Sequence, residues 1–322
     1  MFGGREHIWK AVVMALLLVL PLAAFWLGNA FYLDLATRLV ILAIAATSLN
    51  LLLGYGGMVS FGHAAYLGIG AYAVGIPAYH DLFGGFESIA SGNGLFHIAL
   101  AVCMAALFAL ITGAISLRTK GVYFIMITMA FAQMVYYFFN SLEEYGGDDG
   151  LVIEIRSDLP LINLDDPVQL FLLCWVSLAA TMLIVRTIVH SRFGMVLRGA
   201  KGNNERMVAL GYNTYLYRLT AYVISGTLCG YAGALMGNFT SFISPEMMAW
   251  SRSGELMFMV ILGGASTTLG PLFGSIVFIV VEEILSSFTI YWHLPFGLML
   301  IAIVLYVRGG LMGLVDMVWG RK

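Results

Sequence analysis

The sequence has 322 residues, of which 61% are hydrophobic and only 11% are charged. Soluble globular chains carry about 25% charged residues, so this composition excludes an ordinary soluble enzyme or binding module. Several apolar runs approach the roughly 20 residues that cross a bilayer as a helix. We therefore expect an all-α, polytopic membrane helical bundle, one domain over residues 1–322, whose surroundings are the lipid bilayer and not nucleic acid.

The apolar runs predict about ten transmembrane segments. They cover residues 11–27, 35–53, 63–79, 95–117, 121–140, 168–189, 219–237, 254–265, 271–285 and 295–307. The run at 254–265 is too short to cross straight, which is typical of a broken helix or a half-span. Arg5 and Lys10 before the first run resemble the start of a signal peptide, but we expect that run to be retained as a span.

Positive charges predict the orientation of the chain in the membrane. With the N-terminus in the cytoplasm, only Arg38, Arg156 and Arg252 of the 16 lysines and arginines fall outside. Both termini are then cytoplasmic. The loop 141–166, which carries eight acidic residues, is then external. This acidic loop either docks a basic surface of a partner or is simply solvated.

A glycine-rich segment separates the second and third expected spans. The stretch LNLLLGYGGMVSFGHAAYLGIGAYAVG (49–75) contains Gly54, Gly56, Gly57 and Gly62. Each glycine costs about 1 kcal/mol against alanine in a helix interior, so an irregular hinge is expected between two helices. Non-helical backbone at membrane depth is tolerated only where it is buried in protein or lines a cavity. The alternative is a plain cytoplasmic turn.

Small residues form stripes at helical spacing, which indicates close packing between membrane helices. One stripe contains Gly226, Gly230, Gly233 and Gly237, and the other contains Ala64, Gly68, Ala71 and Gly75. The third span starts inside and the eighth starts outside, so spans two to five and seven to ten allow an inverted repeat. The resemblance of GMVSF (57–61) to GNFTSF (237–242) supports this repeat.

Residues 190–218 form a basic segment that is too polar to insert into a membrane. Asn203 or Asn204 can cap a short helix, and Gly211 can end it. A two-turn helix is not stable alone, so it needs a partner surface. The alternative is an amphipathic loop that lies on anionic lipid.

Polar side chains inside apolar runs are candidates for a substrate path, because such residues are costly in a membrane and often functional. The candidates are Asn50, Ser60, His63, Thr128, Gln133 and Asn140. Gln133 lies well inside its span and either lines the path or bonds to a neighbouring helix. Glu282 and Glu283 either extend toward the outer surface or pair with Arg252.

Motifs of covalent chemistry are absent from the sequence. It contains no GxxxxGK[ST], HExxH or GxSxG motif and no Cys/His cluster with metal-ligand spacing. The chain therefore cannot cradle ATP phosphates in a P-loop, and we expect neither a metal nor a cofactor in it. A continuous proton relay is also not visible, which disfavours a proton-driven carrier.

Several stretches in order along the chain carry a family resemblance. They are LGYGGMVSFGHAAYLGIGAYA, LRTKGVYFIMITMAFAQMVYYFFN with GGDDGL, RFGMVLRGAKGNNERMVALGYN, FISPEMM, VILGGASTTLGPLFGSI and YVRGGLMGL. Together they resemble the membrane permeases of bacterial ABC importers for branched-chain amino acids, the LivM subfamily. The resemblance covers about residues 35–314 and is specific as a set.

The resemblance implies a permease in the bacterial inner membrane that forms the translocation path with a homologous permease subunit. It also implies two cytoplasmic ATPase subunits, which bind ATP and Mg, and a periplasmic substrate-binding protein. The expected substrates are branched-chain or other neutral amino acids. Relatives with this pattern also handle urea, short amides or aromatic acids. The competing interpretation is a secondary carrier that works alone.

In this family a cytoplasmic loop holds the coupling helix, which docks in a groove of an ATPase subunit. The resemblance gives this role to Arg198, Asn203, Asn204, Glu205, Arg206, Met207, Ala209, Leu210 and Gly211. The usual Ala-Ala pair is replaced by Arg206 and Met207, and the acidic residue is shifted to Glu205. We therefore expect the helix to be present with altered ATPase contacts. The glycine hinge is expected to shape the cytoplasmic end of the path and to move with the ATPases.

Overall fold

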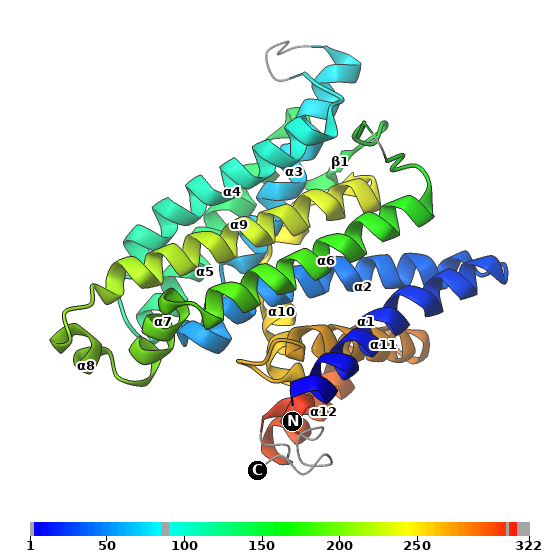
Figure 1. The fold of residues 1–322 in the computed structure, drawn as a ribbon. Helices are drawn as coiled ribbons and strands as arrows, with labels where there is room; N and C mark the ends of the chain where they lie inside the picture. The colour runs from blue at the N-terminus through cyan, green and yellow to red at the C-terminus, as the bar shows by residue number, and fades with distance from the viewer. Residues whose placement is uncertain (1–2, 85–89, 161, 307–308, 314–322) are drawn as a thin grey trace.

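The computed structural model describes residues 3–84, 90–160, 162–306 and 309–313, and it is a bundle of long helices (Figure 1). The helices are α1 (Gly3–Trp26), α2 (Ala30–Asn50), α3 (His63–Phe83), α4 (Gly94–Ser116), α5 (Val122–Asn140), α6 (Pro167–His190), α7 (Arg192–Gly202), α8 (Asn204–Ala209), α9 (Thr214–Thr240), α10 (Trp250–Gly263), α11 (Gly270–Phe288) and α12 (His293–Tyr306). Two short strands, β1 (Leu151–Val152) and β2 (Phe242–Ile243), pair antiparallel. The polytopic all-α membrane fold predicted from the sequence is confirmed.

Six of the described helices are long and apolar enough to cross a membrane. They are α2 with its continuation to Gly56, α4, α5, α6, α9 and α11. Shorter apolar helices occupy Val12–Trp26 and His293–Ile303. The remaining crossings of the expected ten stay a prediction. The first apolar run packs against α2 and α6, and the indole Nε1 of Trp175 donates to the carbonyl of Met14 at 3.2 Å.

Helix α10 corresponds to the short apolar run at 254–265. It begins earlier than expected, at Trp250, and its 14 residues end at Gly263. At about 1.5 Å per residue it is roughly 21 Å long, which is less than the roughly 30 Å of a hydrocarbon core. The segment before it contains β2 and a 3₁₀ turn, Pro245–Met248. This pattern of a broken, short helix is what the sequence indicated.

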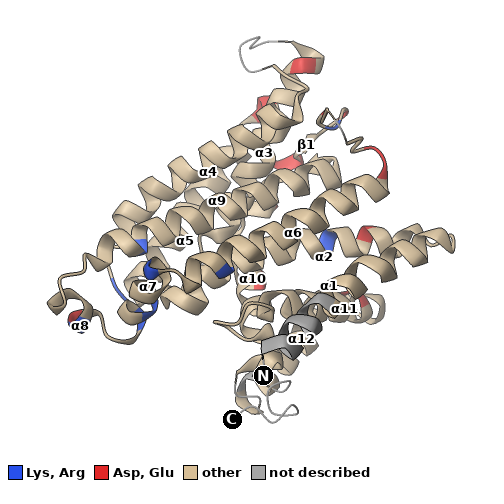
Figure 2. Ribbon diagram, viewed as in Figure 1, with Lys and Arg blue, Asp and Glu red and all other residues tan. Residues whose placement is uncertain are grey.

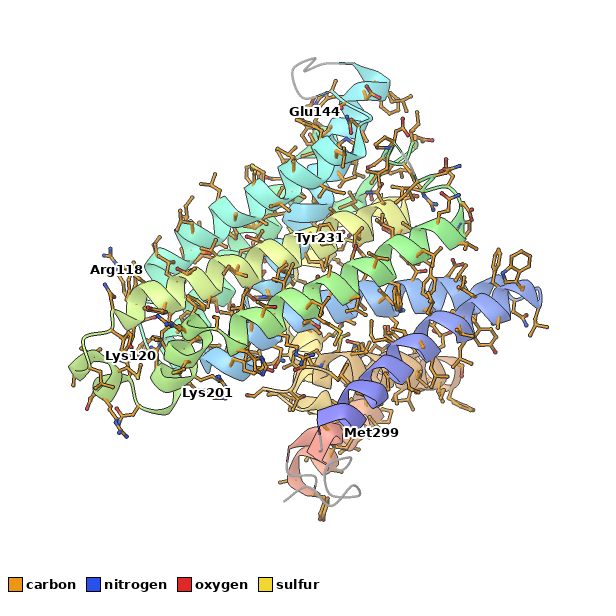
Figure 3. The ribbon with its side chains drawn as sticks, in the orientation of Figure 1. Arg118, Lys120, Glu144, Lys201, Tyr231 and Met299 are labelled. Atoms are coloured by element: carbon orange, nitrogen blue, oxygen red, sulfur yellow. The ribbon has the colours of Figure 1, made fainter. Side chains whose placement is uncertain are left out.

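Many of the charged residues lie toward the two ends of the bundle (Figure 2). Lysines and arginines gather where α7 and the α4–α5 turn lie, and we call this the basic end. Acidic residues gather around the loop 141–166 and β1, which we call the acidic end. Figure 3 shows Arg118, Lys120 and Lys201 at the basic end and Glu144 at the acidic end. Arg308, Arg321 and Lys322 lie outside the described residues.

The loop 141–166 is fastened to the connection between α9 and α10. β1 pairs with β2, and the Arg156 Nε donates to Ser241 Oγ at 3.2 Å. The backbone N–H of Ser157 donates to Oδ1 of Asn238 at 3.0 Å. The loop therefore holds the end of α9 that lies at the acidic end of the bundle, whereas its docking to a partner stays a prediction.

Helix pairing follows a twofold pattern. Helices α2 and α9 pack against each other, α3 packs on α9 and α10 packs on α2. Likewise α4 packs on α3 and α9, while α11 packs on α10 and α2. These pairs relate α2–α5 to α9–α12. Because α2 runs toward the basic end and α9 runs away from it, the packing is that of an inverted repeat.

Glycines of α9 allow its close approach to α3. A Cβ added at Gly233 would overlap the carbonyl oxygen of Leu67, and one at Gly70 would overlap that of Gly230. The α3 stripe meets the expectation of a helix partner only in part, because Ala71 packs against Gly237 of α9 but its glycines do not. Its glycines at 68 and 75 face the side chains of Met248 and of the paired strands, whereas Gly70, which was not in the predicted stripe, meets α9. Backbone contact of this kind needs residues without side chains.

Candidate functional site

The predicted hinge is a π-helical turn followed by irregular backbone. Helix α2 continues into the π-turn Leu51–Gly56, and Gly57 then adopts φ of 68°, which glycine tolerates without steric cost. The chain passes Ser60, which is fully buried, before α3 begins at His63. Single π-helical turns inside α-helices are frequent at functional sites. Met58, Ser60 and Gly62 of this non-helical stretch are buried by protein, whereas Gly57 is exposed and Val59 and Phe61 are half-buried.

Thr128 joins the hinge to α5. The backbone N–H of Phe61 donates to Thr128 Oγ1 at 3.2 Å, and the hydroxyl donates to the carbonyl of Ile125 at 2.9 Å. A Cβ at Gly62 would lie 2.9 Å from the carbonyl oxygen of Thr128. Thr128 is fully buried, and its hydroxyl oxygen accepts a hydrogen bond from the hinge backbone.

His63 joins the hinge to α9. Its Nε2 lies 2.9 Å from Ser225 Oγ, and that hydroxyl donates to the carbonyl of Ser48 at 2.5 Å. Because the single hydroxyl proton is used on Ser48, Nε2 of His63 must be the donor to Ser225. Its Nδ1 is then a buried acceptor with no partner among the described residues. Ser60, His63 and Thr128, predicted as path candidates, therefore meet around the hinge.

Asn50, another path candidate, lies at the centre of a hydrogen-bond network at the basic end. Its Nδ2 donates to the carbonyl of Thr267 at 2.9 Å, and its Oδ1 accepts from the N–H of Ser266 at 3.0 Å. The hydroxyl of Ser266 donates to the carbonyl of Gly54 at 2.5 Å. Nζ of Lys201 donates to the same carbonyl at 2.5 Å. The network connects three elements: the hinge, α7 and the connection between α10 and α11.

The basic segment 190–218 folds into two helices. Ser191 caps α7 by accepting from the N–H of Gly194 at 3.4 Å, and Asn203 caps α8 by accepting from the N–H of Arg206 at 2.9 Å. The sequence predicted α8 but not α7. The spacing of the buried side chains of α7 at 196, 197 and 200 is the amphipathic signal that could have revealed it.

Helix α7 rests on the bundle, whereas α8 projects from it. Nη2 of Arg218 donates to the carbonyl of Ala200 at 3.0 Å, which ties α9 to α7. No residue of α8 is buried among the described residues, and Val208 and Leu210 are 54% and 65% exposed. Gly211 has φ of 87°, which suits its expected role as the end of the helix. The exposed apolar side chains leave α8 available for a partner surface.

A cavity of about 300 Å³ lies between the hinge and this segment. Gly57 of the hinge and Asn204 of α8 both line it, together with Lys120 and Arg218. The structure therefore brings predicted hinge and coupling residues to one place. The other path candidates lie elsewhere: Gln133 and Asn140 follow Thr128 on α5 by roughly 7 and 18 Å along the helix.

Within the described residues, two ion pairs involve α2, α10 and α11, and the sequence did not predict them. Nη2 of Arg38 on α2 contacts both carboxylate oxygens of Glu282 on α11 at 2.8 and 3.1 Å. Nη1 of Arg252 contacts Oε2 of Glu255 at 2.8 Å within α10. Of the two alternatives for Glu282, the direct ion pair with Arg252 is not formed, because its carboxylate bonds to Arg38. Arg38 and Arg252 were exceptions to the positive-inside rule, and this was the signal that they have another role.

A second cavity, of about 230 Å³, opens beside these ion pairs. Its polar lining includes Arg38, Arg252 and Glu255. Its apolar lining comes from α2, α3, α9 and α10, the four central helices of the repeat. The lining residues are Leu42 on α2, Ala64 and Leu67 on α3, Met236 on α9, Leu256 and Met259 on α10, and Met247 before α10. The cavity thus lies at the first turns of the two broken helices, α3 and α10. Half-helix ends at a repeat interface are where transporters place their ligand sites.

Comparison with known proteins agrees with this arrangement. The family described as "Branched-chain amino acid transport system / permease component" matches residues 31–307. The high-affinity branched-chain amino acid transport system permease protein LivM of Escherichia coli is 23% identical, over 94% of this chain and 75% of that protein. The probable LivM permease of Methanocaldococcus jannaschii is 24% identical, over 83% of this chain and 89% of that protein.

A more distant similarity covers part of the chain. The nucleoside ABC transporter permease protein NupC of Lactococcus lactis is 30% identical, over 42% of this chain and 47% of that protein. No solved structure matches the chain. The family match covers most of the sequence, including the hinge, both ion pairs and both cavities. The chain belongs to the family of permease components of branched-chain amino acid transport systems and is a multi-pass membrane permease of the ABC type.

Proposed function

We propose that this chain is one of two homologous permease subunits of an ATP-driven importer in the bacterial inner membrane. In this proposal the basic end faces the cytoplasm, both termini are cytoplasmic and the acidic end faces the periplasm. Two cytoplasmic ATPase subunits supply the energy, and a periplasmic binding protein delivers branched-chain or other neutral amino acids. ATP and Mg bind to the ATPase subunits, in keeping with the absence of a P-loop motif from this sequence.

The observation that carries this proposal is the physical connection between α8 and the hinge. Helix α8 is exposed at the basic end, and it follows directly from α7. Lys201 near the end of α7 bonds to the hinge carbonyl of Gly54 and contacts Ser266 before α11. A partner that moves α8 therefore acts on backbone next to both broken helices. A carrier that works alone has no need for such an exposed, capped helix tied to its hinge.

A helix-breaking substitution in α8 tests the proposal in the reconstituted complex. Val208 is exposed, but its N–H lies inside the helix, so Val208→Pro should break α8 and leave the membrane helices intact. We expect ATP hydrolysis to lose its stimulation by the binding protein, and uptake to fall to background. Val208→Ala is the matched control and should keep both activities.

Two results contradict the proposal. Stimulated hydrolysis that stays normal in Val208→Pro removes the coupling role of α8. Uptake by the chain alone in liposomes, without ATPase subunits, establishes a secondary carrier instead. The melting temperature of each variant complex checks that the membrane helices remain folded.

A further inference from the structure

We propose that the cavity between α2, α3, α9 and α10 binds the transported solute as an α-amino acid zwitterion with an aliphatic side chain. This inference rests on the proposed function, because it places a binding station on the path of the same importer. It also selects one substrate class among those that related permeases handle. The observations that carry it are the chemistry of the lining, the balance of charge and the position of the cavity.

The pair formed by Arg252 and Glu255 offers both charges that a zwitterion needs. Their contact uses Nη1 of the arginine and one carboxylate oxygen, Oε2. The other donors of the guanidinium and Oε1 have no protein partner among the described residues. A guanidinium binds a carboxylate through two parallel hydrogen bonds, and a carboxylate accepts from an ammonium group. In an α-amino acid these two groups share one carbon, so neighbouring opposite charges in the protein match them.

The charge balance of the site favours a solute without net charge. Arg38 lines the same cavity and is neutralised by Glu282, whose side chain is only 14% exposed. Glu282 also attracts Arg252 electrostatically. The two ion pairs therefore sum to zero, while Glu246 also attracts Arg252 electrostatically, and charges in a membrane are tolerated when they are paired. A zwitterion preserves this balance and an aromatic monocarboxylate adds a negative charge, whereas urea can hydrogen-bond to both groups but has no formal charge to pair with either.

The rest of the lining suits an aliphatic side chain. Leu67, Met236, Leu256 and Met259 form an apolar wall beside the ion pair. The volume of about 230 Å³ is below the roughly 300–1,000 Å³ of pockets for drug-sized ligands, so it suits one small solute. Methionine side chains are flexible and adapt to different shapes. The wall therefore accommodates several aliphatic side chains and does not require one.

The cavity lies where the two broken helices meet. The N–H of Ala64 in the first turn of α3 donates to Oγ of Ser253 in the first turn of α10 at 2.9 Å. Arg252 and Glu255 flank this serine on α10. Movement of either helix start would change the distance between the apolar wall on α3 and the ion pair on α10. A binding site where the starts of α3 and α10 meet can bind and release its solute as the hinge moves.

The experiment uses the full importer complex in proteoliposomes with its binding protein. Glu255→Gln removes the partner of the ammonium group, and we expect leucine uptake to fall at least about tenfold. Stimulated ATP hydrolysis should stay within about twofold of the unmodified complex, because α8 and the Lys201 network are untouched. Glu283→Gln makes the same chemical change next to Glu282 but outside the cavity lining, and it should retain uptake.

A second variant tests the apolar wall independently of the charges. Met259→Phe should narrow the wall and lower the ratio of leucine to alanine uptake at least about fivefold. If Glu255→Gln and Met259→Phe both transport as the unmodified complex does, the station is disproved. Equal loss of uptake in Glu283→Gln also overturns it. Failure of the unmodified complex to couple hydrolysis to the binding protein is a distinct result, since it refutes the proposed function itself.

Discussion

Nζ of Lys201 lies 2.5 Å from the carbonyl oxygen of Gly54, although 147 positions separate the two residues. The same ammonium group is 3.3 Å from Oγ of Ser266. One side chain of α7 thereby contacts the π-helical end of α2 and the start of the α10–α11 connection. A continuous set of bonds of this kind is a physical route by which displacement of α7 reaches both halves of the repeat.

Removal of this contact should separate ATP hydrolysis from transport. In Lys201→Met the hinge carbonyl loses its charged donor, a change of about 1 kcal/mol at this partly exposed position. We expect the complex to fold and to hydrolyse ATP with the binding protein, while amino acid uptake falls at least about fivefold. Arg192→Met removes a cation from an exposed position of the same helix and should leave the uptake-to-hydrolysis ratio unchanged. An unchanged ratio in Lys201→Met shows that the contact is only structural.

Asn50 should be important for stability and not only for function. Its side-chain amide donates to the carbonyl of Thr267 and accepts from the N–H of Ser266, so Asn50→Leu leaves these two backbone groups without their partner. At roughly 1–3 kcal/mol for each, we expect a loss of about 2–6 kcal/mol in the free energy of unfolding. Thermal unfolding of the purified protein in detergent measures this as a lower melting temperature.

Thr47 supplies the control for Asn50 on the same helix. Its Oγ1 is buried without a partner among the described residues, so Thr47→Val removes a polar atom that makes no bond. We expect the melting temperature to stay the same or to rise. Equal destabilisation by Asn50→Leu and Thr47→Val would mean that packing, and not hydrogen bonding, determines the effect at this level of α2.

The hinge should not tolerate a side chain at Gly57. Its φ of 68° is strained for other residues, and a Cβ would lie 2.8 Å from Cγ of Lys201. We expect Gly57→Leu to reduce uptake at least about tenfold by displacing α7 from the hinge. Gly202→Leu, at a position with open space, should transport normally. Normal transport by Gly57→Leu supports the simpler interpretation that this segment is only a turn.

Two glycines of one α9 stripe should differ sharply in their tolerance of alanine. A Cβ at Gly233 would overlap the carbonyl of Leu67, so Gly233→Ala should push α3 and α9 apart and lower the yield of folded protein. At Gly237 the nearest atom is Cα of Ala71 at 3.4 Å, so Gly237→Ala should change the melting temperature by only a few degrees. Similar effects at both positions contradict the close packing of these helices.

Much of the membrane fold follows from local features of the sequence. The apolar runs give the long helices because a bilayer demands internal hydrogen bonding over a fixed length. Asn203 and Gly211 mark α8 because helix ends need a cap and a left-handed residue close in sequence. The glycines at 54–62 indicate a break because their cost in a helix is local. The short run that became α10 was recognised by length alone.

The partners of the polar groups were decided by tertiary structure. Glu282 pairs with Arg38, 244 positions away, and nothing in their local sequences selects that partner. Asn50 was predicted as a path candidate, and only the position of Ser266 shows that its amide is used at the α10–α11 connection. The ion-paired cavity likewise exists only because four helices meet there. The length and apolarity that a bilayer requires allow the helices to be predicted from the sequence. Which helix faces contact each other depends on packing between segments that are distant in the sequence.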